Sequence, residues 1–107
     1  MGQQRGLYRV VVELAGKLHR RTEVAPCAVL DLTEKGLRFR TDLRVTLNEE
    51  LQLEFILTEV RSIHCTVQIT NVMPPYVGAR IIEISPEHQK YLSHFIEQLI
   101  ALNLTGF

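Results

Sequence analysis

The chain has 107 residues, 46% of them apolar, and its twelve basic and twelve acidic residues give a formal net charge of zero. A chain of this length fits one domain with one core, so we expect neither disorder nor a structural metal. Zero net charge argues against a protein that coats DNA or RNA, because such binding depends on many phosphate contacts. It leaves room for one small anionic ligand in a local basic pocket.

Cysteine usage and hydropathy predict a cytoplasmic protein. Cys27 and Cys65 each lie in an apolar run, without metal-like spacing to each other or to the histidines. We therefore expect buried free thiols rather than a disulfide, which suits a reducing compartment. The sequence has no apolar run near the roughly 18 residues of a membrane-spanning helix and no recognisable signal peptide, so we expect no membrane insertion.

Short strands with one buried face are predicted over the first three quarters of the chain, because apolar and polar residues alternate there. The predicted strands cover residues 7–14, 27–32, 37–41, 51–57, 62–70 and 76–84. Residues 17–24 are mostly polar, and an extended conformation there would add a seventh strand. Gly16 is expected to mark a turn, and the two prolines of "MPPY" predict another, because proline donates no ladder hydrogen bond.

The hydrophobic period changes to that of a helix over residues 85–104. Ser85 is a typical N-cap and Pro86 suits the first helical position. The apolar residues that recur at helical spacing are Leu92, Phe95, Ile96, Leu99 and Ile100. This face packs on a core, or alternatively meets a partner's groove or a second copy of the chain. Six or seven strands and one helix predict a small, mostly β, antiparallel barrel that the helix plugs or flanks.

Two short motifs combine residues that are typical of an anion site. "RGLYR" places Arg5 and Arg9 four positions apart, and "DLTEKG" runs from Asp31 through Thr33 to Gly36. A guanidinium group is planar and always charged, so it donates to a phosphate or to the acceptor edge of guanine in a bidentate way. Lysine would supply only a point charge.

These motifs, with their spacing, resemble the signature of PilZ domains, bacterial receptors for cyclic di-GMP. The resemblance continues through "GLRF" and "LQLEF" to "VGARIIEISPEHQKYLSHFIEQL" and covers nearly the whole chain. It implies a six-stranded antiparallel β-barrel of the split-barrel type with one C-terminal α-helix. We expect a single domain over 1–107, with a flexible arm at 1–9, the barrel at 10–84 and the helix at 85–104.

The resemblance assigns contacts with cyclic di-GMP to Arg5, Arg9, Asp31, Thr33 and Gly36. The arginines would hold phosphates and guanine. The Asp31 carboxylate would accept from two adjacent donors of guanine that adenine lacks, so guanine preference would depend on it. Thr33 supplies a hydroxyl where family members more often have serine. Gly36 is expected to take positive φ and close the turn.

Other arginines are secondary candidates. Arg38 and Arg40 alternate on the outer face of a predicted strand, and Arg80 lies in "GARI"; each is a possible further phosphate contact. Arg20 and Arg21 are adjacent and lack the three-residue gap of the arginine motif, so we interpret them as solvated charges.

The resemblance implies a receptor without a cofactor. We expect no enzymatic activity, because the sequence shows no nucleophile with a base and an orienting group. The arm would order over the ligand, and a protein partner would read the new surface. The resemblance implies a partner in motility, pilus, exopolysaccharide or biofilm control. The alternative is a PilZ-like adaptor that binds protein partners without nucleotide. Gln4 stands where many family members have a basic residue, so one ligand molecule and a stacked pair both remain open.

Overall fold

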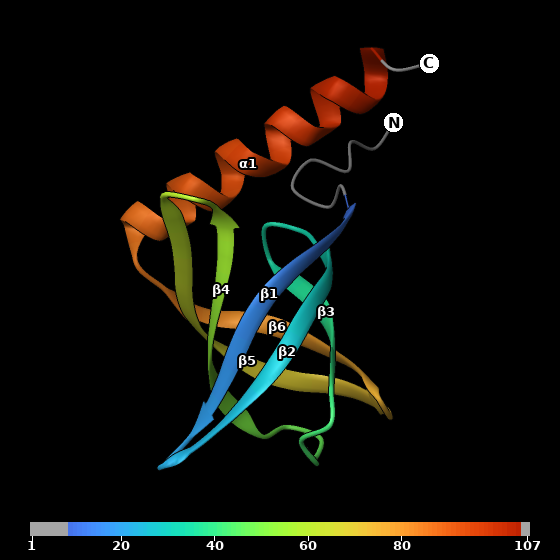
Figure 1. The fold of residues 1–107 in the computed structure, drawn as a ribbon, viewed down its shortest axis with the longest axis vertical. Coiled ribbons are helices and arrows are strands. Elements are labelled where there is room, and N and C mark those ends of the chain that lie inside the picture. The colour runs from blue at the N-terminus through green and yellow to red at the C-terminus, as the bar shows by residue number, and fades with distance from the viewer. Residues whose placement is uncertain (1–8, 106–107) are drawn as a thin grey trace.

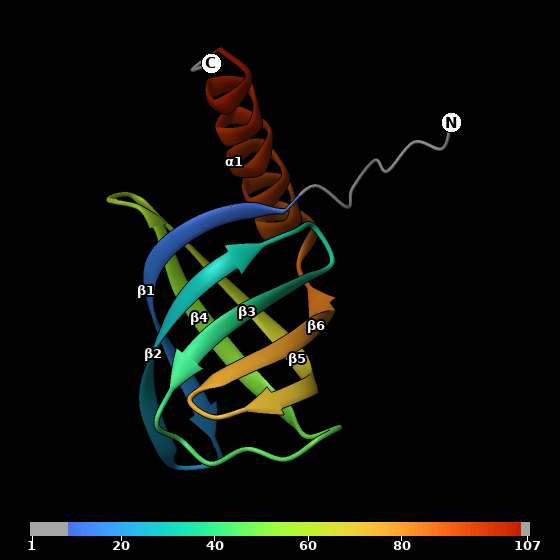
Figure 2. The same cartoon turned by 90° about the vertical axis from the view of Figure 1, so that its right-hand side faces the viewer.

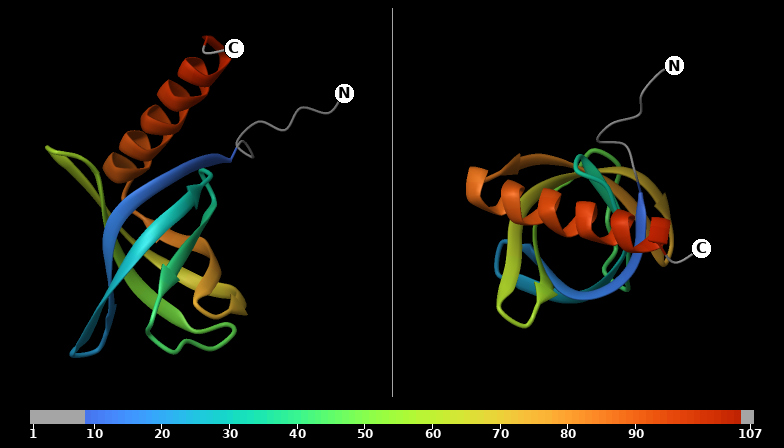
Figure 3. Two further views of the ribbon diagram at one scale, coloured as in Figure 1. Left: turned by 45° about the vertical axis from the view of Figure 1, so that its right-hand side comes forward. Right: turned by 90° about the horizontal axis from the view of Figure 1, so that it is seen from above.

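The computed structural model describes residues 9–105, and the side chains of residues 9–102. The elements in this range are β1 (Val10–Arg20), β2 (Glu23–Leu32), β3 (Gly36–Thr41), β4 (Glu50–Thr58), β5 (Arg61–Met73), β6 (Tyr76–Ile84) and α1 (Pro86–Thr105). The strands close into an antiparallel barrel in the order β1-β2-β3-β6-β5-β4 (Figure 1). Figure 3 shows α1 lying across one end of the barrel. The predicted six-stranded barrel with a C-terminal helix is confirmed.

Alternating side chains of the strands fill the barrel, as the two-residue period predicts. Phe39 of β3 and Phe55 of β4 are fully buried, and α1 adds Leu92 and Ile96. The predicted thiols, Cys27 and Cys65, are confirmed as free and buried. Burial raises the pKa of Cys27 to about 11 and that of Cys65 to about 12, so both stay neutral near pH 7.

The start of α1 is fixed by two hydrogen bonds. Ser85 Oγ accepts from the amide of His88 at 3.1 Å, which confirms Ser85 as the N-cap. His88 Nδ1 in turn accepts from the amide of His64 at 3.0 Å and joins the helix to β5. In the part of the chain that is described, no helix has both the length and the hydropathy to cross a membrane.

Gly16 does not mark a turn, contrary to the prediction. It lies inside β1, where it pairs with Cys27 of β2 and with Phe55 of β4. A Cβ atom on Gly16 would lie 2.8 Å from the carbonyl oxygen of Glu54 and 3.1 Å from Cβ of Phe55. The close approach of β4 therefore requires glycine here. The turn follows Arg20 instead, and Arg21 in that turn has a φ of 55°.

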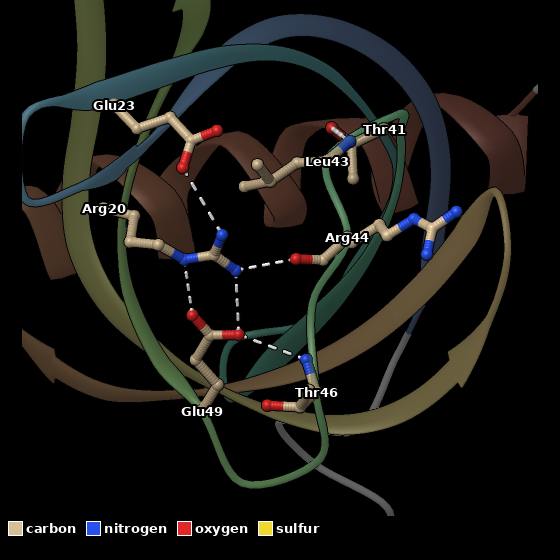
Figure 4. Close-up of polar contacts among 7 residues, drawn as sticks. All are labelled: Arg20, Glu23, Thr41, Leu43, Arg44, Thr46 and Glu49. Carbon is tan, nitrogen blue, oxygen red and sulfur yellow. Dashed lines mark hydrogen bonds and ion pairs between the residues drawn. The ribbon is translucent and has the colours of Figure 1, made fainter.

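Arg20 is not the solvated charge that we predicted. Its Nε donates to Glu49 Oε2 at 2.7 Å and its Nη2 to Oε1 at 3.0 Å, as Figure 4 shows. Nη2 also donates to the carbonyl of Arg44 at 2.7 Å, and Glu49 Oε1 accepts from the amide of Thr46 at 3.1 Å. This network joins the β1–β2 hairpin to the loop before β4, at the barrel end opposite α1 (Figure 1).

The Arg20–Glu49 pair makes part of the stability sensitive to acid. Hydrogen bonds from Arg20 hold the pKa of Glu49 below its ordinary value. The stabilisation is complete above the unfolded pKa, about 4.3, and is lost as pH falls through the lower folded value. We expect Glu49→Gln to lower the free energy of unfolding by about 1 kcal/mol at neutral pH. This deficit should shrink towards about pH 3 in urea titrations; an unchanged deficit would contradict the assignment.

Candidate ligand-binding site

A β-bulge in β2 places Asp31 on the outer wall of the barrel. Val29 points into the core, and uninterrupted alternation would send Asp31 there as well. The register between β2 and β3 shifts at this point: Val29 pairs with Phe39, but Asp31, two residues further along β2, pairs with Arg38, only one residue away on β3. Leu30 is the additional residue of the bulge. Asp31 consequently lies beside an outward-facing arginine.

Two guanidinium groups cover the Asp31 carboxylate. Arg38 Nε donates to Oδ2 at 2.6 Å, and Arg9 Nε lies 3.8 Å from Oδ1. The side chain of Asp31 is only 5% exposed, whereas those of Arg9 and Arg38 are 68% and 48% exposed. The arginines therefore face solvent with much of their donor capacity, while the carboxylate is covered by them.

Tyr76 adds an aromatic face that sequence reasoning missed. The guanidinium carbon of Arg38 lies 5.5 Å from the centroid of the Tyr76 ring, within the range of a cation–π contact. Tyr76 begins β6, which pairs with β3 although the two strands are far apart in the chain. The sequence signal was an aromatic residue directly after a turn, but only the strand order brings it to Arg38.

Thr33 closes the β2–β3 turn next to Asp31. Its Oγ accepts from the amides of Lys35 at 3.1 Å and Gly36 at 2.9 Å. The hydroxyl donates to the carbonyl of Gly36 at 3.1 Å, and the Thr33 amide donates to the same oxygen at 2.8 Å. In this structure the hydroxyl thus serves the turn. A contact between Thr33 and a ligand remains a prediction.

Gly36 does not take the positive φ that we predicted. It begins β3 and pairs with Arg80 of β6. A Cβ atom on Gly36 would lie 2.9 Å from the carbonyl oxygen of Ala79, so the close approach of β6 requires glycine. Glycine is needed at position 36 because the backbones of β3 and β6 pack too closely there to admit a side chain.

The structure brings some predicted residues together and separates others. Arg9, Asp31 and Arg38 form one cluster, and the turn with Thr33 and Gly36 adjoins it. Arg40 is exposed further along β3. Arg80 donates to Oε1 of Gln68 at 2.9 and 2.6 Å. Arg5 lies outside the described residues.

The geometry and the charges define a class of site. Cations with free donors surround one carboxylate on the outer wall of a small β-barrel, and this arrangement suits an anion that also offers hydrogen-bond donors. Within residues 9–105, no group of three or more His, Cys, Asp or Glu is placed to hold a metal ion.

The family model of the PilZ domain matches residues 3–98, and the chain therefore belongs to the PilZ domain family. The resemblance noted in the sequence is confirmed by this match, which covers both motifs, all six strands and most of α1. No curated protein matches the chain.

Solved structures share the fold at low sequence identity. The Bacillus subtilis inhibitor of motility (MotI/DgrA) matches with a TM-score of 0.74 and 16% identity, over 87% of this chain and 50% of that one. The PilZ domain of YcgR from Escherichia coli, solved with c-di-GMP, gives 0.73 and 14%, over 92% and 95%. The PilZ domain of CeSA from a cellulose-synthesizing bacterium gives 0.66 and 7%, over 90% and 98%. The chain thus spans half of MotI/DgrA but nearly all of the two isolated domains.

Proposed function

We propose that the protein is a non-enzymatic, cytoplasmic receptor for cyclic di-GMP (c-di-GMP), which it binds against the wall formed by β1, β2 and β3. The observation that carries this proposal is the Asp31 carboxylate held between Arg9 and Arg38. Membership of the PilZ family supports it, as does the fold shared with a YcgR domain that was solved with c-di-GMP.

Binding is proposed to proceed by exchange of partners. The donors of one guanine take the place of the arginine donors on Asp31, and the released guanidinium groups of Arg9 and Arg38 pair with phosphates or with guanine acceptors. Each charged group exchanges an internal partner for one on the ligand, so no buried charge is left unpaired. Arg5 is assigned to the same ligand from the family motif.

The arm formed by residues 1–9 is proposed to order over the ligand. Ordering costs about 1–2 kcal/mol per residue, and charge-assisted hydrogen bonds of about 1.5–3 kcal/mol each offset it. The surface formed in this way is what a protein partner would read. The fold shared with an inhibitor of motility makes motility control the first process to test.

Calorimetric titration with c-di-GMP tests the receptor function directly. We expect saturable binding by the wild type and about 10- to 100-fold weaker binding by Arg9→Ala, because one charge-assisted contact is lost. Arg21→Ala is the matched control, since Arg21 is an exposed arginine at the other end of β1. Wild-type affinity in Arg9→Ala would overturn the assigned role of Arg9. Absence of any binding by the wild type would instead favour an adaptor that works without nucleotide.

A further inference from the structure

A second candidate site lies between the tip of the β4–β5 hairpin and the first half of α1. It is a groove of about 330 Å³, lined mainly by Leu57 and Arg61 of the hairpin and by Lys90, Tyr91, His94 and Phe95 of the helix. We call it the hairpin–helix groove. Figure 2 shows the hairpin tip on one side of the barrel and the β2–β3 turn on the other, so the groove is separate from the nucleotide site.

The floor of the hairpin–helix groove is apolar. Leu57 is buried, and Tyr91 and Phe95 are half-buried against the core. Residues 91 and 95 are four positions apart, so their rings lie next to each other on one side of α1. The volume is at the lower end of the range for ligand pockets, about 300 Å³, and suits one or two bulky apolar side chains.

The rim of the hairpin–helix groove is cationic. Arg61 lies 4.0 Å from the centroid of the Tyr91 ring, and this stacking holds its guanidinium group over the floor. Lys90 and His94 are exposed, and no ion pair or side-chain hydrogen bond joins either of them to another residue of the described chain. The described lining residues include no aspartate or glutamate.

In the described part of the chain, no carboxylate forms an ion pair with Arg61 or Lys90. Glu87 lies one turn before Lys90 on the helix, and its Oε2 accepts from the hydroxyl of Tyr91 at 2.7 Å. It lines a neighbouring pocket together with Arg61 and Tyr91, and does not line this groove. The groove therefore combines an apolar floor with cationic side chains that form no ion pair within the described residues. A phosphate alone would leave the floor uncovered, and an apolar ligand alone would leave the cations without partners.

We propose that the hairpin–helix groove docks a short acidic and apolar segment of a partner protein. One leucine or phenylalanine of the segment lies on Leu57, Tyr91 and Phe95. Carboxylates beside it pair with Arg61 and Lys90. The charge complementarity of the lining carries this choice of partner, and it does not depend on nucleotide binding.

The test uses fluorescent 12-residue peptides without nucleotide. The first set carries one leucine or phenylalanine among aspartate, glutamate, serine and glycine; the second replaces each acid by lysine, and the third replaces the apolar residue by alanine. We expect only the first set to bind in fluorescence polarisation, with affinity that falls as salt rises. Amide signals of Arg61 and of residues 90–98 should shift in NMR spectra of the complex. Equal binding of the second or third set, or shifts confined to other parts of the barrel, would overturn the proposal.

A charge reversal on the rim gives the matched comparison. Lys90→Glu should weaken binding of the first peptide set about five-fold, because an attractive contact becomes repulsive. Lys17→Glu makes the same change at an exposed position of β1 and should leave binding within about two-fold. Equal effects of both variants would contradict the proposal. A concentration-dependent dimer in ultracentrifugation that Lys90→Glu abolishes would assign the groove to a second copy of the chain and overturn the proposal of a separate partner.

Lys90→Glu also separates this proposal from the receptor function. Its affinity for c-di-GMP should equal that of the wild type, since Lys90 lies away from the cluster of Arg9, Asp31 and Arg38. A protein that binds no c-di-GMP at all can still bind the acidic peptides, so failure of one proposal leaves the other testable.

Discussion

Asp31→Ala is expected to weaken c-di-GMP binding by about 100-fold or more and to leave the stability of the barrel nearly unchanged. The carboxylate is proposed to accept two hydrogen bonds from guanine, each worth about 1.5–3 kcal/mol when one partner is charged. Loss of both corresponds to at least a hundred-fold in affinity. The cost to folding is small because the partner guanidinium groups of Arg9 and Arg38 are more than a third exposed, so water replaces the carboxylate.

Three measurements check this expectation. Calorimetry gives the affinity for c-di-GMP, the same titration with cyclic di-AMP gives the discrimination between guanine and adenine, and urea unfolding gives the stability. Asp42→Ala is the control, because Asp42 is an exposed aspartate in the loop after β3. If Asp31→Ala retained the preference of the wild type for guanine, the carboxylate would not be the group that recognises it.

The alternation of apolar residues predicted the barrel well because it reports burial directly. It identified β3 to β6 close to their observed bounds, and the change to helical spacing did the same for α1. The prediction failed at Gly16, because a single sequence does not distinguish a glycine in a turn from a glycine required by a closely approaching neighbouring strand. The deciding neighbours, Glu54 and Phe55, are almost forty positions away.

The sequence motifs pointed to Arg9 and Asp31, which the structure brings together, but not to the contacts around them. In a regular strand, Asp31 would point to the same side as the core residue Val29, two positions earlier. Only the bulge at Leu30 turns Asp31 outward. The contact between Arg38 and Tyr76 depends on the pairing of β3 with β6, which are not consecutive. Contacts of this kind arise from strand order and register, which local patterns do not encode.

The network of Arg20 was missed for a related reason. Arg20 and Glu49 are 29 positions apart in the chain. Two adjacent arginines, Arg20 and Arg21, at the end of a strand look like the exposed charges of a turn. Barrel closure brings the loop before β4 onto the β1–β2 hairpin, and the bidentate geometry follows from that approach.

Gly16→Val is expected to lower the free energy of unfolding by about 3 kcal/mol, at the upper end of the range for overpacking a core. The added Cβ would meet the Glu54 carbonyl at 2.8 Å, the Cys27 sulfur at 3.1 Å and Cβ of Phe55 at 3.1 Å. Two of these three neighbours are fixed by the strand backbone and cannot give way cheaply. The pairing of β1 with β4 spans only four residue pairs, Gly16 to His19 on β1, so a disturbance there acts on the whole closure of the barrel.

Ala15→Val is the matched control for this change. Ala15 precedes Gly16 on β1 but is exposed, and valine favours a strand, so its stability should stay within about 0.5 kcal/mol of the wild type. In thermal unfolding, Gly16→Val should melt roughly 10 °C or more below Ala15→Val. Equal melting temperatures would mean that β4 moves away from β1 without cost. The pairing of Gly16 with Phe55 would then not be what closes the barrel.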